Sequence, residues 1–188
     1  ARRLRFHGLD KDAWKRFSKE GSPHTEVMEP ARKANFMDLQ AALGLHQLKK
    51  LDGFNVRRGV LFRRYLELLK DIEGLVLPWE GDAVHGHCFH LFVLRIRPEA
   101  IGMDRDALVQ ALKEENIGTG IHYRPAHLHA FYRTFYREHP EGLPPEGLPH
   151  TEWSGDRLLS LPLWPGLTEA DQDQVVAALR HVLKHGGR

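Results

Sequence analysis

The sequence contains one cysteine and no long apolar run, and each shortage excludes a class of protein. With Cys88 alone, the chain forms no internal disulfide, which agrees with a reducing compartment. The longest apolar stretch runs from Cys88 to Ile96, is interrupted by His90 and Arg95, and is far shorter than the roughly 20 residues that span a bilayer. We therefore expect a cytoplasmic protein without a membrane span.

A charge imbalance is also lacking. The 27 basic and 25 acidic residues nearly cancel, and no dense run of Lys or Arg is present. A nucleic-acid partner is therefore not expected. The 188 residues, of which 41% are hydrophobic, suffice to bury the core of one domain, or of one domain and part of another.

The short motifs of self-contained catalytic sites are missing as well. The sequence has no P-loop, no GxGxxG, no GxSxG, no HExxH and no CxxC. Its first residues include neither an initiator methionine nor an apolar signal-peptide stretch, and they begin as if within an amphipathic helix. Such a start is typical of a fragment, so we expect the chain to be part of a longer protein.

The densest group of metal-ligating side chains is His85, His87 and His90, with Cys88 among them. On a strand, His85 and His87 would share a face, whereas His90 would point to the other. No second pair of Cys or His at the spacing of a structural zinc site accompanies them. The stronger interpretation is a polar loop that enters a buried strand, and we predict no metal site.

Apolar residues recur at three- and four-residue spacing between Met37 and about Asp71, with Lys and Arg between them. They are Leu39, Leu43, Leu51, Phe54, Leu61, Tyr65, Leu66 and Leu69. This pattern predicts one long helix, or two helices with a break, and Asn35 is its expected N-cap. We place a domain boundary after the helix: residues 1–74 contain the end of one domain and the long helix, and residues 75–188 form a small domain.

Strands and helices alternate in the second half of the chain. The expected elements are a buried strand at 88–96, a helix capped by Asp104 that runs through Leu112, a strand at 119–123, a helix at 128–138, a loop at 140–149, a strand at 158–163 and a helix at 169–183. Thr168 and Asp171 resemble a capping box that opens the last helix. This order predicts a small α/β sandwich whose sheet is covered on one face by helices.

Two polar segments are candidate binding sites. The first, Ile121 to His127, places two imidazoles, a phenol and a guanidinium at the end of a short strand. This set of side chains suits a sugar nucleotide, because Arg pairs with phosphate oxygens and His donates hydrogen bonds to hydroxyls or to a diphosphate. The alternative is a polar strand end with Tyr123 half-buried. Lys33-Ala34-Asn35 precedes the long helix, whose N-terminus favours an anion. On spacing alone, however, an asparagine at this position is most often just an N-cap.

Motifs along the whole chain form one pattern. They are Phe6-His7-Gly8-Leu9, Asp12-Ala13-Trp14, Lys33-Ala34-Asn35, Asp38-Leu39-Gln40-Ala41-Ala42-Leu43, Gln47-Leu48, Lys50-Leu51-Asp52, Arg57-Arg58, His90-Leu91-Phe92, Ile117 to Arg124, Ala126-His127, Thr151-Glu152-Trp153 and Ser160-Leu161-Pro162-Leu163. Through these motifs the chain resembles the DegT/DnrJ/EryC1/StrS sugar aminotransferases, and within them most closely the UDP-4-amino-4-deoxy-L-arabinose–oxoglutarate aminotransferase type.

The resemblance implies the C-terminal part of a fold type I aminotransferase that depends on pyridoxal 5'-phosphate (PLP). Residues 1–74 would end the large PLP-binding domain and form the long interdomain helix, and residues 75–188 would be the small α/β domain. The implied reaction moves an amino group from glutamate to a nucleotide-linked 4-keto sugar, for lipopolysaccharide or other surface-glycan synthesis. In such enzymes PLP forms a Schiff base with a lysine that lies upstream of the segment resembling Arg-Leu-Arg-Phe-His-Gly.

That lysine lies outside this chain. The lysines present are Lys11, Lys15, Lys19, Lys33, Lys49, Lys50, Lys70, Lys113 and Lys184, and none sits in the family's lysine motif. No catalytic residue is therefore assigned. The remaining large domain, which would supply the lysine and the residues around the PLP ring, is an implied partner of this chain.

The resemblance also assigns binding residues. Asn35 occupies the position of an asparagine that reaches across a homodimer interface to the PLP phosphate of the other subunit, so shared active sites are implied. His122, Tyr123 and Arg124 match the strand end that lines the sugar-nucleotide cleft, and Lys33 is a weaker candidate. Binding and orientation would be the contribution of this half.

One departure from the family pattern lies on the cofactor side. The family commonly has Gly-Tyr before the Lys-x-Asn element, and this chain has Ala31-Arg32, a difference that bears on substrate identity and activity. The missing lysine supports a non-catalytic sugar-nucleotide-binding or dimerisation module as the alternative. An encoding frame that continues upstream into a large domain would favour the enzyme.

We expect no aminotransferase turnover by this chain alone, because it lacks the lysine that would hold the cofactor. The measurement is the intact mass of the protein from its native source, with a scan for the visible absorbance of bound PLP. A mass well above 21.6 kDa together with that absorbance agrees with a piece of a working enzyme. A mass of 21.6 kDa without the absorbance supports the binding module instead.

Overall fold

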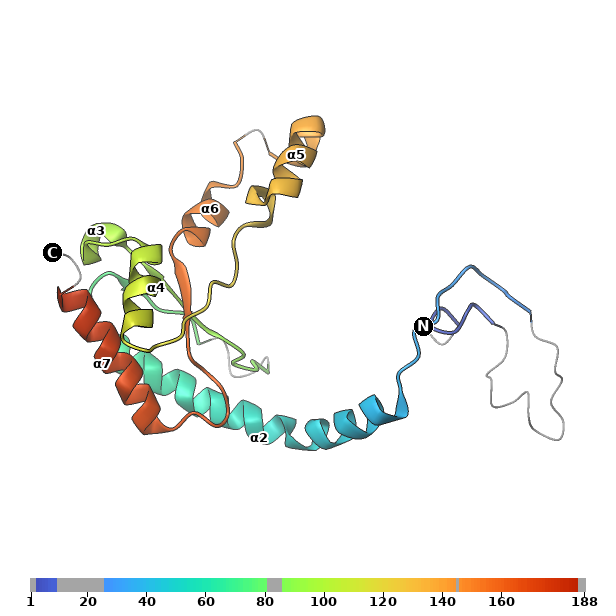
Figure 1. Ribbon diagram of the computed structural model, residues 1–188, viewed down its shortest axis with the longest axis horizontal. Helices are drawn as coiled ribbons and strands as arrows, with labels where there is room; N and C mark the ends of the chain where they lie inside the picture. The colour runs from blue at the N-terminus through green and yellow to red at the C-terminus, as the bar shows by residue number, and fades with distance from the viewer. Residues whose placement is uncertain (1–2, 10–25, 81–85, 145, 186–188) are drawn as a thin grey trace. The chain divides into compact units, whose positions relative to one another are not determined.

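The structure is a computed structural model that describes residues 3–9, 26–80, 86–144 and 146–185 (Figure 1). It divides into two compact units, Ala1–Leu51 and Asp52–Arg188. The first unit is built on a short backbone pairing, and the second on a three-stranded sheet with helices.

The first unit pairs a segment of turns, residues 3–9, with residues 27–34. Phe6 forms an antiparallel bridge with Lys33, and the backbone N–H of Ala34 donates to the carbonyl of Arg5 at 2.7 Å. Gly8 has a φ of +70°, and a Cβ at this position would overlap the carbonyl of Glu29. A glycine is therefore required where the segment crosses.

Helix α2 is a single helix of 32 residues, Asp38–Leu69, as the apolar spacing predicts. The prediction that Asn35 caps it is wrong, because the helix begins three residues later. The pairing of the preceding segment keeps the backbone extended through Ala34, and the first turn is capped by Gln40, whose Oε1 accepts from the N–H of Met37 at 3.0 Å.

The sheet of the second unit contains three antiparallel strands in the order β1-β2-β3: Leu75–Val76, Phe92–Ile96 and Leu158–Leu161. The central strand is shorter than the expected 88–96, because the backbone turns at Phe89. This residue has a φ of 47°, and its N–H donates to His87 Nδ1 at 3.0 Å. The strand starts only after that turn.

The expected strand at 119–123 is wrong in extent. Only Gly120 pairs, as an isolated antiparallel bridge with Ser160 on the free side of β3. Residue 125 is a proline, which has no N–H for a ladder, and the chain leaves the sheet before it. The fourth strand is thus reduced to one bridge, which places residues 121–125 at the end of the sheet.

The apolar face of the sheet is the centre of the core. Phe92, Leu94 and Ile96 are fully buried and share one face of β2. The rings of Phe62 and Tyr65 from α2 each lie 4.9 Å from the ring of Phe92. Two more helices contribute to the same core, α4 (Arg105–Glu114) and α7 (Glu169–His185).

Two polar side chains inside this core donate hydrogen bonds to backbone carbonyls. The side-chain amide of Gln172, fully buried on α7, donates to the carbonyl of Leu61 on α2 at 2.9 Å. The hydroxyl of Tyr65 donates to the carbonyl of Pro162 at 3.0 Å. These bonds join the two helices and the end of β3 without leaving the donors unpaired.

Several predicted helix ends are confirmed. Asp104 caps α4, and its Oδ1 accepts from the N–H of Ala107 at 2.8 Å. At the start of α7 the N–H of Asp171 donates to Thr168 Oγ1 at 3.1 Å, and the N–H of Thr168 donates to Asp171 Oδ2 at 3.0 Å, which is a capping box.

Short helices complete the second unit. They are α3 (Pro98–Ile101), η2 (Ala126–Leu128), α5 (Ala130–Glu138), η3 (Pro140–Gly142) and α6 (Pro149–Gly155). Helix α5 lies within the expected range, whereas α6 was not predicted. Within this unit α4, α7 and the second half of α2 lie together, and α5 lies furthest from them (Figure 1). In the described part of the chain, no helix is both long and apolar enough to cross a bilayer.

Asp171 provides a test of the capping box. Its hydrogen bonds with Thr168, from the hydroxyl and the N–H, hold the pKa of the Asp171 carboxyl below its usual value. A carboxyl with a lowered folded-state pKa stabilises the fold above its unfolded pKa, about 4, and this contribution is lost as the pH falls through the lowered value. We expect Asp171→Ala to lower Tm at pH 7, and to lower it less in acid below about pH 4.

Thermal denaturation followed by circular dichroism measures both differences. Glu138→Ala is the matched control, because that carboxylate is exposed at the end of α5 and forms no side-chain hydrogen bond among the described residues. An Asp171→Ala variant that loses as much Tm in acid as at neutral pH would contradict the assignment.

Candidate functional site

The candidate site lies on the face of the sheet opposite the core. Residues of β2 and β3 alternate between the two faces, so Val93 and Ser160, which are paired across the strands, share the second face with Arg95. Ser160 is 4% exposed. This face therefore presents polar and charged groups where the first presents a continuous apolar surface.

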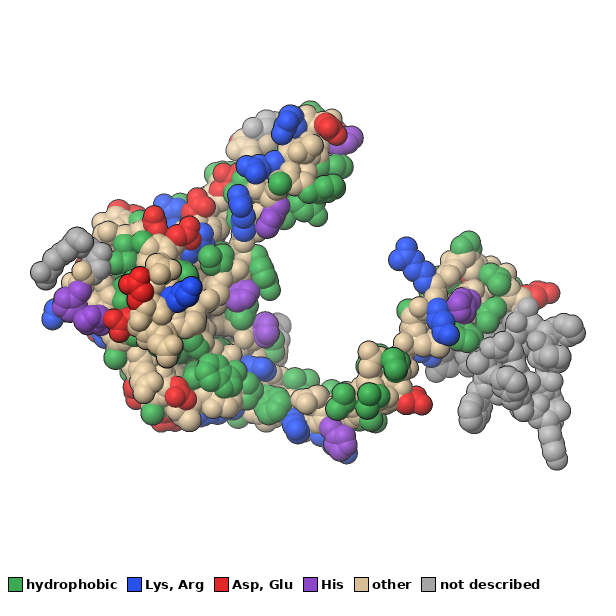
Figure 2. Space-filling model, in the orientation of Figure 1, with side chains coloured by type: hydrophobic (Ala, Val, Ile, Leu, Met, Phe, Trp, Pro, Cys, Tyr) green, Lys and Arg blue, Asp and Glu red, His purple; other side chains and the backbone are tan. Residues whose placement is uncertain are grey.

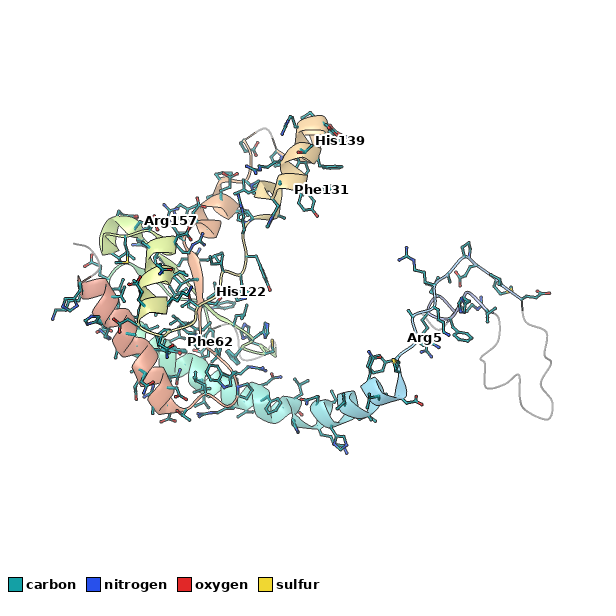
Figure 3. The ribbon with its side chains drawn as sticks, viewed as in Figure 1. Arg5, Phe62, His122, Phe131, His139 and Arg157 are labelled. Atoms are coloured by element: carbon teal, nitrogen blue, oxygen red, sulfur yellow. The ribbon has the colours of Figure 1, made fainter. Side chains whose placement is uncertain are left out.

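His122, which is labelled in Figure 3, is fixed to this face by Ser160. Its Nδ1 lies 2.9 Å from Ser160 Oγ, and its ring meets the ring of Tyr123 edge-on, with centroids 4.9 Å apart. A Cβ on Gly120 would overlap the His122 ring. The glycine therefore leaves the space in which the imidazole lies back over the sheet.

Tyr123 and Arg124 follow His122 and project from the structure. Tyr123 is 72% exposed, so the alternative of a half-buried tyrosine is wrong. Arg124 is also exposed, and no side-chain hydrogen bond of this guanidinium is formed within the described residues. The predicted cluster is thus an anchored imidazole followed by a phenol and a guanidinium that are available to a ligand.

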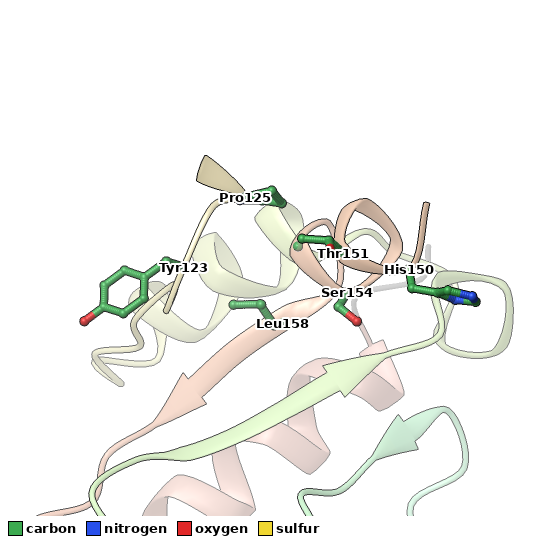
Figure 4. A pocket seen from close by; sticks show the side chains of 7 residues that line it. Tyr123, Pro125, His150, Thr151, Ser154 and Leu158 are labelled. Carbon is green, nitrogen blue, oxygen red and sulfur yellow. The ribbon is translucent and has the colours of Figure 1, made fainter. Parts of the chain in front are cut away.

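A cavity of about 350 Å³ lies next to this segment (Figure 4). It is lined by Tyr123, Pro125, His150, Thr151, Ser154, Gly155 and Leu158. Two hydroxyls and an imidazole in this lining come from helix α6. Sequence reasoning missed them as site residues, although Thr151 belongs to one of the motifs that characterise the chain.

Helix α6 is held firmly against the His122 segment. His127 Nε2 lies 2.9 Å from Glu152 Oε1, and the His127 side chain is only 9% exposed. A Cβ on Gly155 would overlap the Pro125 ring, so the two walls of the cavity are in close contact there. Arg105 donates to the carbonyl of Gly155 at 3.0 Å, which ties the end of α6 to α4.

Cationic groups surround the ring of Trp153 on α6. The guanidinium carbon of Arg157 lies 4.9 Å from the ring centroid, and that of Arg95 lies 5.5 Å from it. Both distances are within the range of a cation–π interaction. With the exposed Arg124, these two arginines supply guanidinium groups near the cavity segment that could pair with an anionic ligand.

Lys33 and Asn35 lie in the first unit, on the segment that precedes α2. The backbone of Lys33 is held by its bridge to Phe6, whereas the side chains of Lys33 and Asn35 are exposed. Neither side chain forms a hydrogen bond or an ion pair with another described residue. Both are therefore available to a ligand or to another chain.

No group of three or more His, Cys, Asp or Glu side chains is arranged for a metal ion in the described segments. His87 and Phe89 have a structural role instead: the His87 ring accepts the N–H of Phe89 and contacts the Phe89 ring edge-on, with centroids 4.4 Å apart. His85 lies outside the described residues.

Comparisons with known proteins agree with one another. Residues 1–180 match the DegT/DnrJ/EryC1/StrS aminotransferase family. Among solved structures, the chain is similar to the aminotransferase TlmJ from Streptoalloteichus hindustanus, with 25% identity and a TM-score of 0.77 over 100% of this chain and 44% of that chain. The similarity confirms the expected fold class, an α/β aminotransferase fold.

Two further solved structures are similar. A DegT/DnrJ/EryC1/StrS aminotransferase from Brucella abortus is 28% identical, with a TM-score of 0.74 over 96% of this chain and 42% of that chain. NtdA from Bacillus subtilis, whose structure contains the bound cofactor PMP, is 28% identical, with a TM-score of 0.75 over 97% of this chain and 38% of that chain. This chain spans less than half the length of each of these three proteins.

Gly155 tests whether close packing holds the walls of the cavity. Gly155→Ala forces its methyl group against Pro125, and overpacking of this kind typically costs about 1–3 kcal/mol. We expect a lower free energy of unfolding in a urea titration. The control is Gly118→Ala, because a Cβ at residue 118 would meet no atom within 4 Å. Equal stability of the two variants would show that the contact does not constrain the cavity.

Proposed function

The chain belongs to the DegT/DnrJ/EryC1/StrS aminotransferase family, and from this premise we propose that it is the C-terminal portion of an enzyme that transfers an amino group from glutamate to a nucleotide-linked 4-keto sugar. The complete enzyme would depend on PLP. A keto sugar of the UDP-4-amino-4-deoxy-L-arabinose type, used in lipopolysaccharide or surface-glycan synthesis, is the substrate that the motifs favour.

The observation that carries this proposal is the arrangement of His122, Tyr123 and Arg124 beside the cavity. A nucleotide sugar combines a diphosphate with hydroxyl-rich rings. The free guanidinium of Arg124 has the planar fork that pairs with phosphate oxygens, and the imidazole of His122 supplies a hydrogen-bonding nitrogen at a defined position. The exposed ring of Tyr123 offers an apolar surface and a hydroxyl.

The cavity beside these residues suits a hydroxyl-rich group. Thr151 and Ser154 bring hydroxyls, which both donate and accept hydrogen bonds, and His150 brings an imidazole. Leu158 and Pro125 supply an apolar surface for a sugar ring. The volume of about 350 Å³ lies within the range of pockets that bind small molecules.

The residues of the first unit fit a phosphate group of the cofactor. Asn35 offers an amide donor and Lys33 an ammonium, both exposed and free of partners among the described residues. We propose that Asn35 contacts the PLP phosphate of the other subunit in a homodimer, with Lys33 in a supporting role. PLP, when bound, supplies the electron sink for transamination. The lysine that would hold it belongs to the part of the enzyme outside this chain.

The first half of α2 is consistent with burial in a larger assembly. Its apolar side chains and those just before it are largely exposed: Phe36, Met37, Leu39, Leu43, Leu45 and Leu48. A group of exposed large apolar side chains is typical of a surface that another part of a protein covers. We propose that the large domain and the second subunit cover them in the complete enzyme.

The alternative function is a non-catalytic module that binds sugar nucleotides or mediates dimerisation. This alternative is favoured because none of the lysines of this chain lies in the family's lysine motif. The two functions share the binding residues of the second unit, so they differ in whether the encoded protein extends into a large domain with the cofactor lysine.

Arg124 is the residue whose loss tests the enzymatic proposal. In the complete enzyme, we expect Arg124→Ala to raise KM for the nucleotide sugar by about 10- to 100-fold, because hydrogen bonds between charged groups contribute about 1.5–3 kcal/mol. A contact made equally in the ground state and the transition state leaves kcat little changed.

Steady-state kinetics with glutamate as the amino donor gives both constants. Arg133→Ala is the matched control, because this exposed arginine lies on α5 and does not line the cavity. An unchanged KM in Arg124→Ala would show that Arg124 does not contact the diphosphate. A complete protein that contains no PLP would favour the binding module instead.

A further inference from the structure

A residue outside the predicted binding motif, Ser160, contacts the imidazole of His122. We propose that Ser160 is a positioning residue that donates its hydroxyl hydrogen to His122 Nδ1, so that the neutral imidazole carries its hydrogen on Nε2 and presents that N–H to an anionic oxygen of the ligand. This inference rests on the proposed function, since it specifies how one of its binding residues works.

The burial of Ser160 determines the direction of the hydrogen bond. The residue is 4% exposed, and the bond to His122 Nδ1, at 2.9 Å, is the only one its hydroxyl forms among the described residues. If Nδ1 were the donor, the hydroxyl hydrogen would be buried without an acceptor, which is costly. With the hydroxyl as donor, every buried hydrogen of the pair is bonded.

The backbone fixes both partners in this geometry. The N–H of Ser160 donates to the carbonyl of Gly120 at 2.7 Å, and the N–H of Gly120 donates to the carbonyl of Ser160 at 3.1 Å. This reciprocal pair holds residue 120 opposite Ser160, two residues before His122. Because Gly120 has no side chain, the imidazole occupies the space above it. The ring is thus confined by a backbone pair on one side and by Tyr123 on the other.

A fixed tautomer has a chemical consequence. A neutral imidazole offers one donor and one acceptor, and the bond made by one nitrogen decides the role of the other. With Nδ1 accepting from Ser160, Nε2 is a donor that matches phosphate oxygens and carbonyl oxygens, which only accept. Without Ser160, both tautomers become accessible, and part of the protein presents an acceptor to these same oxygens.

The first test measures affinity in the complete enzyme, with uridine diphosphate as the probe. We expect Ser160→Ala to weaken binding by about 3- to 10-fold, the change that the loss of one hydrogen bond typically causes. Ser160→Thr retains the hydroxyl and is expected to restore most of the affinity. Val93→Ala is the matched control, because it truncates the paired residue on the same face of the sheet and leaves the hydroxyl in place.

The second test reads the tautomer directly and requires no ligand. In protein with 15N-labelled histidine, at a pH where the imidazole is neutral, the nitrogen shifts of His122 identify the protonated nitrogen; His122→Asn assigns the signals. We expect hydrogen on Nε2 in the wild type and in Ser160→Thr, and a mixture of tautomers in Ser160→Ala. Hydrogen on Nδ1 in the wild type would overturn the inference.

His122→Ala separates failure of this inference from failure of the proposed function. If His122→Ala and Ser160→Ala both weaken binding and Ser160→Thr does not, the inference is supported. If only His122→Ala weakens binding, His122 is a ligand residue but Ser160 does not position it, and the inference is wrong. If His122→Ala binds uridine diphosphate as the wild type does, the role of His122 in the proposed function fails, whatever the tautomer measurement shows.

Discussion

The alternation of side chains along β2 and β3 is the constraint on which the second unit depends. Leu94 and Leu159 point to one face and are fully buried, so α2, α4 and α7 have an apolar surface to pack on. Each such leucine contributes about 1.5–3 kcal/mol on burial. A slip of one residue would exchange the faces, and Ser160 would enter the core. The apolar residues of β3 therefore determine where Ser160, and with it His122, lies.

The core and the site are linked through the end of β3. Tyr65 of α2 donates to the carbonyl of Pro162, the residue that follows this strand. Burial raises the pKa of Tyr65, so its hydroxyl remains protonated and keeps this bond. The same strand carries Ser160 on its other face, which means that helix packing on one side stabilises the binding geometry on the other.

Helices α6 and α5 form two further surfaces, the first polar and the second aromatic. Helix α6 is tied to α4 by Arg105 and to the segment after His122 by His127, and it lines the cavity with hydroxyls. Helix α5 has exposed aromatic rings, and hydrophobic side chains gather on one side of it in Figure 2. The rings of Phe131 and Phe135 stack with their centroids 6.2 Å apart. Such an exposed apolar side is unusual for a chain that acts by itself. It agrees with the proposal that this chain is part of a larger assembly.

The sequence by itself determined the elements whose signals are local. The periodic apolar residues of α2, the Asp104 cap and the Thr168–Asp171 capping box all involve residues within a few positions of one another, and the structure contains each of them. The family motifs identified the segment that contains His122. Only the tertiary structure decided what long-range contacts control: the reduction of a strand to the bridge at Gly120, and the partner of His122. Ser160 lies 38 residues away in the chain, and periodicity carries no information about which distant side chain will meet an imidazole.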